Sequence, residues 1–311
     1  MKPLLFALDA PEWLARSLLH HTGFDAGKVD RRQFPDGESY VRLLTPVDGR
    51  DVVLICSLDR PDGKTVPLLF AADAVRTQGA RSVGLAAPYL AYMRQDKAFR
   101  PGEAVTSVTY SRLLSNQFDW LVTVDPHLHR YPRLNAIYSI PAIAASAVTP
   151  IADWIARNVE RPFLIGPDSE SEQWVEGIAR LAAAPFTVFH KTRTGDREVS
   201  IEGTKAPIPA GATPVIVDDI ASSARTMIEA VRMLKANGAQ APLCIAVHAL
   251  FAGDAFPKLL EAGPAGVVST NTVVHETNAI DVSAVIAEAV LLAVAVPRPE
   301  TEPGAAGTVS A

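Results

Sequence analysis

Two adjacent carboxylates, Asp218 and Asp219, stand between a short β-branched run and a hydroxyl-rich turn that ends at Thr226. The run at 215–217 predicts a strand buried on both faces, and apolar residues recur at helical spacing from Met227 onward. The free N–H groups and dipole of a helix N-terminus attract an anion, while paired carboxylates bind sugar hydroxyls or a hard cation such as Mg²⁺. A phosphorylated sugar would satisfy both parts of this stretch. The alternative is a solvated loop that ends in an N-cap.

Two basic segments could neutralise a polyphosphate. The segment 88–107 follows an apolar run and is rich in cations, which suit phosphate oxygens unless the segment is only a solvated loop. The segment 191–199 lies between a predicted strand and the acidic turn. Its cations could close over a reacting phosphate as a lid, although an exposed hairpin tip would show the same composition. The polar residues concerned are Arg94, Gln95, Asp96, Lys97 and Arg100 in the first segment, and Lys191, Arg193 and Arg197 in the second.

Histidine and carboxylate side chains follow two further predicted strands. Asp125, His127 and His129 end one of them, and the two histidines could share a metal, but a pair of histidines alone is not a zinc site. Asp168 ends the other and is either an N-cap or a metal carboxylate.

A turn at Asp36-Gly37 predicts a hairpin over 33–43. Phe34 beside Asp36 and Glu38 presents an aromatic face and two acceptors, which suits an adenine ring and its amino group. A bare hairpin would explain the same residues.

Composition excludes several classes of protein. The chain has 311 residues, of which 48% are hydrophobic and 20% charged, as in an ordinary soluble globular protein of about two domains. A formal charge of −5 without a dense basic stripe argues against nucleic acid as a partner. Cys56 and Cys244 sit inside apolar runs and are expected to be reduced core residues. No signal peptide or membrane span is expected, so we expect a cytoplasmic protein.

Apolar runs alternate with helical patterns along the chain. The runs are mostly continuous and β-branched, which predicts a doubly wound α/β fold with mostly parallel sheets covered on both faces. Helices are expected, for example, over 65–78, 106–116, 170–183 and 226–236. The predicted strands are the runs at 3–8, 52–58, 82–90, 120–125, 162–166, 185–190, 214–219, 243–251 and 266–274.

An internal sequence repeat predicts a tandem duplication. The strand–helix–strand unit around Ile55 is repeated around Ile216, at an offset of 161 residues. This spacing is too long for a solenoid. We therefore expect an N-terminal nucleotide-side domain over 1–147 and a C-terminal ribose-phosphate-side domain over 148–296, with the seam in 139–150. The Pro-, Gly- and Ala-rich tail 297–311 is expected to be disordered.

Taken together, these stretches resemble the ribose-phosphate diphosphokinase (phosphoribosyl pyrophosphate synthetase) family. The resemblance covers roughly residues 30–275 and rests on the order FPDGE, PYxxYxRQD, VDxH, PD, KxRxGDR, VDD and VHALF. It implies two phosphoribosyltransferase-like domains, and transfer of the β,γ-diphosphoryl group of MgATP to the anomeric hydroxyl of ribose 5-phosphate, giving PRPP and AMP.

The resemblance also implies roles for individual residues. Adenine would be held across a subunit interface of a homo-oligomer, a dimer or hexamer. The implied residues are Phe34, Asp36, Glu38, Arg94, Gln95 and Asp96 for ATP; His127 and Asp168 for Mg²⁺; Lys191, Arg193 and Arg197 for the transferring group; and Asp218, Asp219, Ser222, Ser223, Ala224, Arg225 and Thr226 for the ribose phosphate.

The phosphate loop departs from the family pattern D/S-T-G-G-T, because Ala224 and Arg225 stand where the paired glycines are usual. Ala224 is not expected to adopt a positive φ readily. Residues 169–172 are likewise acidic and polar instead of glycine-rich. An altered sugar-phosphate acceptor, or a non-catalytic homologue that regulates or assembles with an active synthetase, therefore stays open. A phosphoribosyltransferase is disfavoured by the tandem halves.

Overall fold

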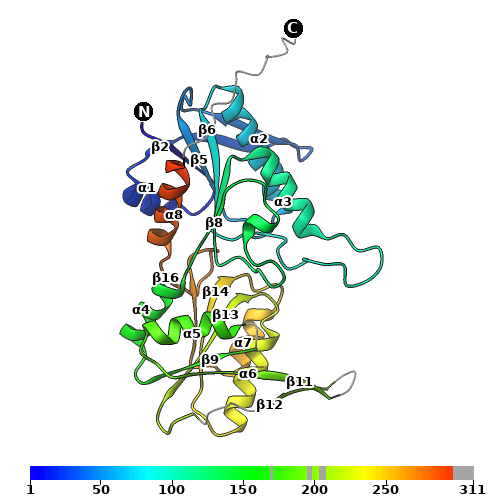
Figure 1. Cartoon of the computed structure of the whole chain (residues 1–311), viewed down its shortest axis with the longest axis vertical. Coiled ribbons are helices and arrows are strands. Elements are labelled where there is room, and N and C mark those ends of the chain that lie inside the picture. Colours follow the sequence, from blue (N-terminus) through cyan, green and yellow to red (C-terminus); the bar gives the residue numbers. More distant parts are fainter. Residues whose placement is uncertain (169–170, 195–197, 203–207, 297–311) are drawn as a thin grey trace.

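A computed structural model describes residues 1–168, 171–194, 198–202 and 208–296. It consists of two α/β halves stacked along the long axis of the molecule (Figure 1). Each half is built on a six-stranded sheet in which every neighbouring pair of strands is parallel. The predicted doubly wound class with mostly parallel sheets is confirmed.

The first sheet has the strand order β2-β1-β5-β6-β7-β8. Its three middle strands, β5, β6 and β7, are buried along their whole length, as their continuous apolar composition predicts. The strands are β1 (Leu4–Asp9), β2 (Asp25–Gly27), β5 (Asp51–Cys56), β6 (Ser82–Ala87), β7 (Trp120–Val124) and β8 (Ala142–Ala145), with helices α1 (Glu12–Thr22), α2 (Asp62–Thr77) and α3 (Thr106–Gln117) and the 3₁₀ turn η1 (Leu134–Ala136).

The second sheet has the order β10-β9-β13-β14-β15-β16. Asp218 and Asp219 lie within its central strand β13, not in a turn after it, and this strand pairs with β14 and ends at Ala221. The strands are β9 (Pro162–Gly166), β10 (Phe186–Val188), β13 (Thr213–Ala221), β14 (Leu243–Ala249), β15 (Gly266–Thr270) and β16 (Asn278–Ile280), with helices α4 (Val148–Asn158), α5 (Glu172–Leu181), α6 (Arg225–Ala236) and α7 (Ala255–Ala262).

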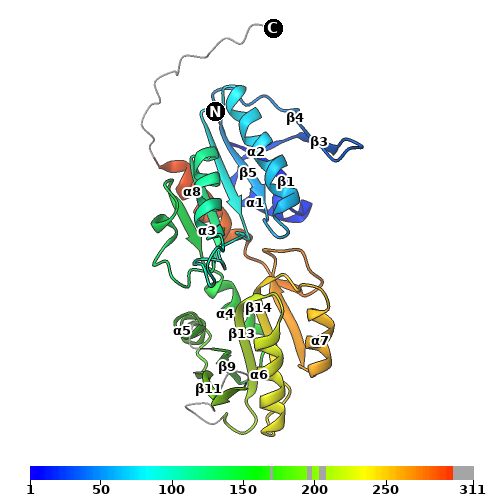
Figure 2. The ribbon, with the colours of Figure 1, turned by 90° about the vertical axis from the view of Figure 1, so that its right-hand side faces the viewer.

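The two halves repeat one topology. In each sheet the second strand along the chain lies at the edge, the first lies inside it, and the others follow in chain order. Each half also inserts an antiparallel hairpin directly after its edge strand: β3 (Val29–Gln33) with β4 (Ser39–Leu43), and β11 (His190–Thr194) with β12 (Glu198–Glu202). Figure 2 shows the first hairpin projecting from its half, and Figure 1 shows the second doing so. The expected duplication therefore extends to both hairpins.

Helix α8 (Ser283–Ala295) crosses back to the first half. It contacts α1 and strands β6, β7 and β8, and its Ile286 and Val290 share a buried cluster with Leu14. The stretch expected as a seam, 139–150, contains β8 and the first residues of α4. Its small apolar residues do form a strand, because β7 supplies a parallel partner. The division at 147–148 stays a prediction.

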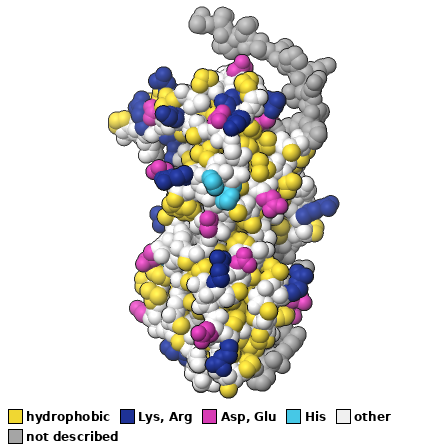
Figure 3. All heavy atoms as spheres, turned by 90° about the vertical axis from the view of Figure 1, so that its left-hand side faces the viewer, with side chains coloured by type: hydrophobic (Ala, Val, Ile, Leu, Met, Phe, Trp, Pro, Cys, Tyr) yellow, Lys and Arg dark blue, Asp and Glu magenta, His cyan; other side chains and the backbone are white. Residues whose placement is uncertain are grey.

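In the described part of the chain, no helix is both long and apolar enough to cross a membrane. Figure 3 shows one face of the molecule, on which basic, acidic and hydrophobic side chains are interspersed. The tail 297–311 lies outside the described residues.

Candidate active site

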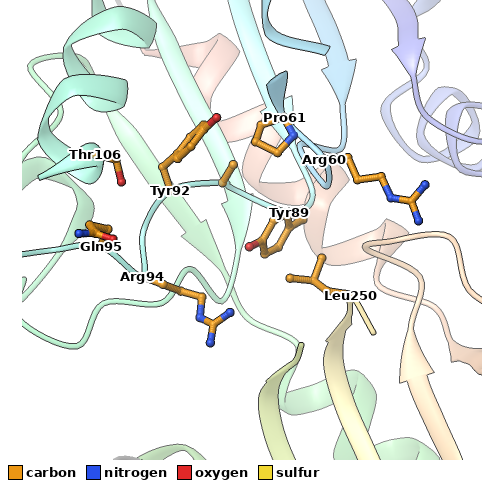
Figure 4. Close-up of a pocket in the computed structure, with 9 residues that line it drawn as sticks. Arg60, Pro61, Tyr89, Tyr92, Arg94, Gln95, Thr106 and Leu250 are labelled. Atoms are coloured by element: carbon orange, nitrogen blue, oxygen red, sulfur yellow. The ribbon is translucent and has the colours of Figure 1, made fainter. Parts of the chain in front are cut away.

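A pocket of about 530 Å³ lies between the halves, where the loops after β5 and β6 face the loop after β14 (Figure 4). We call it the cationic pocket, because Arg60 and Arg94 are the charged side chains among its described lining residues. Figure 4 shows their guanidinium groups on opposite sides of Tyr89 and Leu250. The lining residues are Arg60, Pro61, Tyr89, Ala91, Tyr92, Arg94, Gln95, Thr106 and Leu250.

A second cavity, of about 470 Å³, gathers acidic side chains from both halves. We call it the acidic cavity. It brings together six of the residues singled out in the sequence, from the ends of β7, β9 and β13: Asp125, His127, His129, Asp168, Asp218 and Asp219. Parallel strands place their carboxyl ends at one edge of a sheet, which brings Asp168 after β9 close to Asp218 and Asp219 on β13. His127 comes from the other sheet, whose strand β7 ends at the same cavity. The lining residues are Asp125, Pro126, His127, Leu128, His129, Ala144, Asp168, Ser171, Trp174, Asp218 and Asp219.

The two adjacent carboxylates have different surroundings. Nδ1 of His127 lies 2.8 Å from Oδ2 of Asp219, and the backbone N–H of Asp219 donates to Oδ1 of Asp218 at 3.0 Å. Burial, together with the charges of Asp219 and Asp168, raises the pKa of Asp218 well above its usual value. Burial also acts to raise the pKa of Asp219, but the hydrogen bond and charge of His127 lower it below its usual value. Their surroundings therefore favour the proton on Asp218 and the negative charge on Asp219.

Asp125 supports the same cavity from the first half. Its carboxylate accepts a hydrogen bond from the backbone N–H of Ala147 at 2.7 Å. Burial raises the pKa of Asp125 to about 6, although this hydrogen bond acts in the opposite direction. Its backbone has a φ of 31°, which is uncommon for a residue with a Cβ atom.

The loop after β13 begins helix α6 as expected, with Arg225 as the first helical residue. The expectation about Ala224 is wrong: this residue does adopt a positive φ, 53°. Its methyl group is buried in the core cluster that contains Met227 and Val231, and its carbonyl accepts from the N–H of Ile228 at 2.9 Å. Packing and the helix's first hydrogen bond thus hold a conformation that local sterics disfavour.

The three residues of the RQD stretch, Arg94, Gln95 and Asp96, have different surroundings. Arg94 and Gln95 line the cationic pocket, whereas Asp96 does not: it is buried and accepts two hydrogen bonds from Nη1 of Arg130, at 2.8 and 3.0 Å. Arg60 and Leu250 were not singled out from the sequence. The carboxyl end of β5 was the available signal for Arg60, because strand ends of a parallel sheet carry sites.

The hairpin residues Phe34, Asp36 and Glu38 line neither of these two cavities. Phe34 is exposed, and the guanidinium of Arg32 lies 4.7 Å from its ring centroid and 4.3 Å from that of Tyr40. This aromatic surface is thus carried on a projecting hairpin.

Two of the three predicted lid residues lie in the second hairpin. Lys191 and Arg193 lie on β11, and Arg197 lies outside the described residues.

The acidic cavity offers carboxylate oxygens to a hard cation. Carboxylate oxygens are the ligands that Mg²⁺ prefers. The pKa of Asp218 is raised by burial and by the nearby charges of Asp219 and Asp168, and a bound cation would offset these charges. Among the described residues, no three His, Cys, Asp or Glu side chains are grouped so that they could hold a metal by themselves. His127 and Asp168 both line this cavity, and a metal held by them would need further oxygen ligands, from a bound phosphate or from water.

Comparison with known proteins agrees with this architecture. Residues 3–117 match the N-terminal domain of ribose phosphate pyrophosphokinase, and residues 134–284 match the phosphoribosyl transferase domain. The ribose-phosphate pyrophosphokinase of Methanopyrus kandleri is 33% identical over 280 residues, covering 89% of this chain and 94% of that protein. The enzyme of Saccharolobus solfataricus is 34% identical over 251 residues, covering 79% and 84%.

A solved structure shows the same fold over nearly the whole chain. The crystal structure of phosphoribosylpyrophosphate synthetase from Mycobacterium smegmatis superposes with a TM-score of 0.81 at 25% identity, covering 94% of this chain and 99% of that one. With the cavities described above, these matches show that the chain belongs to the ribose-phosphate pyrophosphokinase family and is an enzyme of PRPP synthesis.

Proposed function

We propose that this enzyme transfers the β,γ-diphosphoryl group of MgATP to the anomeric hydroxyl of ribose 5-phosphate, giving PRPP and AMP. The observation that carries the proposal is the adjacency of the two cavities. Tyr89 lines the cationic pocket, Asp125 lines the acidic cavity, and the buried ring of His248 contacts both residues. Cationic side chains bind phosphate oxygens, and carboxylates bind sugar hydroxyls and hard metal ions. The cationic pocket therefore suits a polyphosphate donor, and the acidic cavity suits a sugar acceptor.

On the nucleotide side, Arg94 and Gln95 contact ATP from within the cationic pocket. Phe34, Asp36 and Glu38 hold adenine, and because they project away from that pocket we assign them to the pocket of a second copy of the chain. The enzyme would therefore be a homo-oligomer, at least a dimer or a hexamer built on that contact. Asp96 was expected to contact ATP directly. Because it forms an ion pair with Arg130, we assign it an indirect role through that arginine.

In the acidic cavity, His127 and Asp168 hold the magnesium of MgATP. Bound Mg²⁺ would neutralise phosphate charge and align the β-phosphorus for in-line attack. The ionised carboxylate of Asp219 accepts hydrogen bonds from the ribose hydroxyls, and Asp218 supports it at the end of β13. The chain itself thus contributes mainly positioning and charge compensation, which is what phosphoryl transfer needs.

The 5-phosphate lies in the loop of Ser222, Ser223, Ala224, Arg225 and Thr226 at the N-terminus of α6, where backbone N–H groups and the helix dipole favour an anion. The β11–β12 hairpin would bring Lys191, Arg193 and Arg197 over the diphosphoryl group during transfer.

The decisive experiment is product analysis. Pure protein with MgATP and ribose 5-phosphate should give AMP and PRPP in equal amounts, detected by ion-exchange chromatography and ³¹P NMR. Formation of ADP would identify a different phosphoryl transfer. Nucleotide binding without AMP would favour the non-catalytic alternative, which the Ala224-Arg225 loop motivates.

A panel of pentose phosphates tests the acceptor. If the loop serves ribose 5-phosphate despite its missing glycines, that sugar should give the highest kcat/KM. A clear preference for another phosphorylated pentose would replace the acceptor while keeping the donor chemistry.

Mixing two inactive variants tests whether the adenine site is shared. Phe34→Ala and Arg94→Ala each remove one side of the site. If the sides come from different copies, co-assembly of the two variants should restore part of the activity, because some sites then contain neither substitution. Absence of recovery in verified mixed oligomers would place both residues in one chain's site.

The proposal also places the enzyme in the cytoplasm, where its two free buried cysteines, Cys56 and Cys244, remain reduced.

A further inference from the structure

His248, near the end of β14, is a buried histidine to which the proposed reaction assigns no direct role. It is only 1% exposed. Its Nε2 atom lies 3.1 Å from the carbonyl oxygen of Val124 and 3.3 Å from that of Asp125, both at the end of β7 in the other half. A side chain of the second half thus contacts the backbone two and three residues before His127.

The imidazole is fixed on its other sides as well. Nδ1 lies 2.8 Å from the hydroxyl of Thr272, and the ring of Tyr89 meets it edge-on with centroids 5.0 Å apart. The carbonyl of Thr272 in turn accepts a hydrogen bond from the hydroxyl of Ser57 at 2.6 Å. The strand ends of both sheets therefore converge on this one ring.

These partners determine the tautomer. Two carbonyl oxygens can only accept, so Nε2 must carry the proton, and Nδ1 is left to accept from the hydroxyl of Thr272. Burial lowers the pKa of His248 to about 4, although the nearby charge of Asp219 and the two carbonyls act to raise it. The ring is accordingly neutral at physiological pH and acts as a fixed donor.

The backbone that His248 contacts is held in an uncommon conformation. Asp125 has a φ of 31°, and its carboxylate is tied to the backbone N–H of Ala147. Such a conformation persists only where surrounding contacts impose it. The Nε2–H of His248 donates to the backbone carbonyls of Val124 and Asp125. The backbone N–H of Ala147 donates to the carboxylate of Asp125.

We propose that His248 is a positioning residue for the acidic cavity. Its Nε2–H fixes the backbone at Val124–Asp125 and thereby holds the ring of His127, two residues further on, against Asp219. The consequence for turnover rests on the proposed function, but the consequence for His127 does not. A reacting group displaced by about 1 Å can cost 100-fold in rate, and loss of the partners that orient metal ligands typically costs 10- to 100-fold.

Two polar substitutions separate this role from simple packing. In His248→Gln the amide nitrogen reaches the position of Nε2 and can donate to the same carbonyls. In His248→Asn the shorter amide reaches only the position of Nδ1 and leaves both carbonyls without their donor. We expect kcat for AMP formation to fall about 10- to 100-fold in His248→Asn and to be largely retained in His248→Gln.

A second readout does not depend on turnover. Long-range ¹H–¹⁵N spectra of the full chain report the ring of His127. Its signals should shift in His248→Asn and stay close to wild type in His248→Gln. The control is His275→Asn, which removes a half-buried histidine of the same half that contacts Phe251 and Phe256 and not β7; it should leave the His127 signals in place.

Each outcome decides the question. Equal behaviour of His248→Asn and His248→Gln in both readouts would overturn the inference, because the Nε2 donor would then not matter. Wild-type protein that makes no AMP, but whose His127 signals respond as expected, would remove the proposed reaction and keep the positioning role. If His248→Asn does not fold, recovery of folding, activity and His127 signals in His248→Gln alone supports the role, and their loss in both contradicts it.

Discussion

Nδ1 of His127 lies 2.8 Å from Oδ2 of Asp219, although the two residues are 92 positions apart and belong to different halves. This hydrogen bond lowers the pKa of Asp219 against the opposing effect of burial. The carboxylate is therefore kept ionised in a cavity where burial alone would favour its protonated form. The pair joins the halves at the point where donor and acceptor would meet.

Replacement of Asp219 by Asn should abolish most turnover. The amide keeps the size of the side chain but removes the charge that would receive the ribose hydroxyls, so kcat should fall about 100-fold or more. Initial rates of AMP formation measure this. The control is Asp254→Asn, which removes an exposed carboxylate that pairs with Lys258 at the start of α7. A kcat for Asp219→Asn equal to that of the control would contradict the assignment.

Asp218→Asn should stabilise the protein while it impairs the reaction. The pKa of Asp218 is higher in the folded state than its ordinary value of 3.8. The wild-type protein therefore loses stability as the pH rises from 3.8 to the pKa of the folded state, because the buried carboxyl group loses its proton less readily than the same group in the unfolded chain. Asn keeps the acceptor for the N–H of Asp219 without the charge. At pH 7 we expect a Tm higher by about 2 °C or more, with the difference vanishing near pH 3.8. A lower Tm at pH 7 would refute the burial argument.

Substitutions at Ala224 should reveal the strain at its φ of 53°. Glycine relieves about 1 kcal/mol of backbone strain but loses a buried methyl worth about 0.8 kcal/mol, so the free energy of unfolding should change by less than about 1 kcal/mol. Valine keeps the strain and adds β-branching, and should cost about 2 kcal/mol. Urea titrations of the two variants measure these values. A loss of stability in Ala224→Gly as large as that in Ala224→Val would contradict the relief of strain at this φ.

Both cysteines should be unreactive in the native protein. Burial, and for Cys56 also the charge of Asp9, raises the pKa of Cys56 and of Cys244 to about 12. Since the thiolate is the reactive form, labelling by a disulfide reagent at pH 8 should be negligible until the chain unfolds, when both thiols react. Mass spectrometry of the labelled protein counts them. Fast modification of the folded protein would show that a thiol is accessible.

Two glycine-to-alanine substitutions should change the free energy of unfolding in opposite directions. A Cβ atom at Gly84 would lie 1.9 Å from Cε2 of Trp120, its partner on β7, and that ring is buried. Gly84→Ala should therefore lower the free energy of unfolding by about 3 kcal/mol or prevent folding. Gly63 lies in α2 with no atom within 4 Å of such a Cβ atom. Gly63→Ala should raise stability by about 0.5 kcal/mol, as measured by urea titration.

The comparison between sequence and structure is clearest at the strands. The apolar, largely β-branched parts of the predicted strands 52–58 and 214–219 form buried parallel strands, because a parallel sheet covered on both sides hides both of their faces. The repeat around Ile55 and Ile216 likewise led to two sheets of one topology. By contrast, the small residues 142–145 look like a linker and become β8 only because β7 offers its edge.

Local pattern thus determined most of the strands and helices, their duplication, and which polar residues stand at strand ends, while β8 needed its tertiary partner β7. Tertiary structure alone decided how those residues are grouped. It brought His127 to Asp219, turned Asp96 toward Arg130, held Ala224 in the left-handed region and returned α8 to the first half. The physical reason is that secondary structure follows from contacts within a few residues, whereas these arrangements depend on sheet order and on packing between segments far apart in the chain.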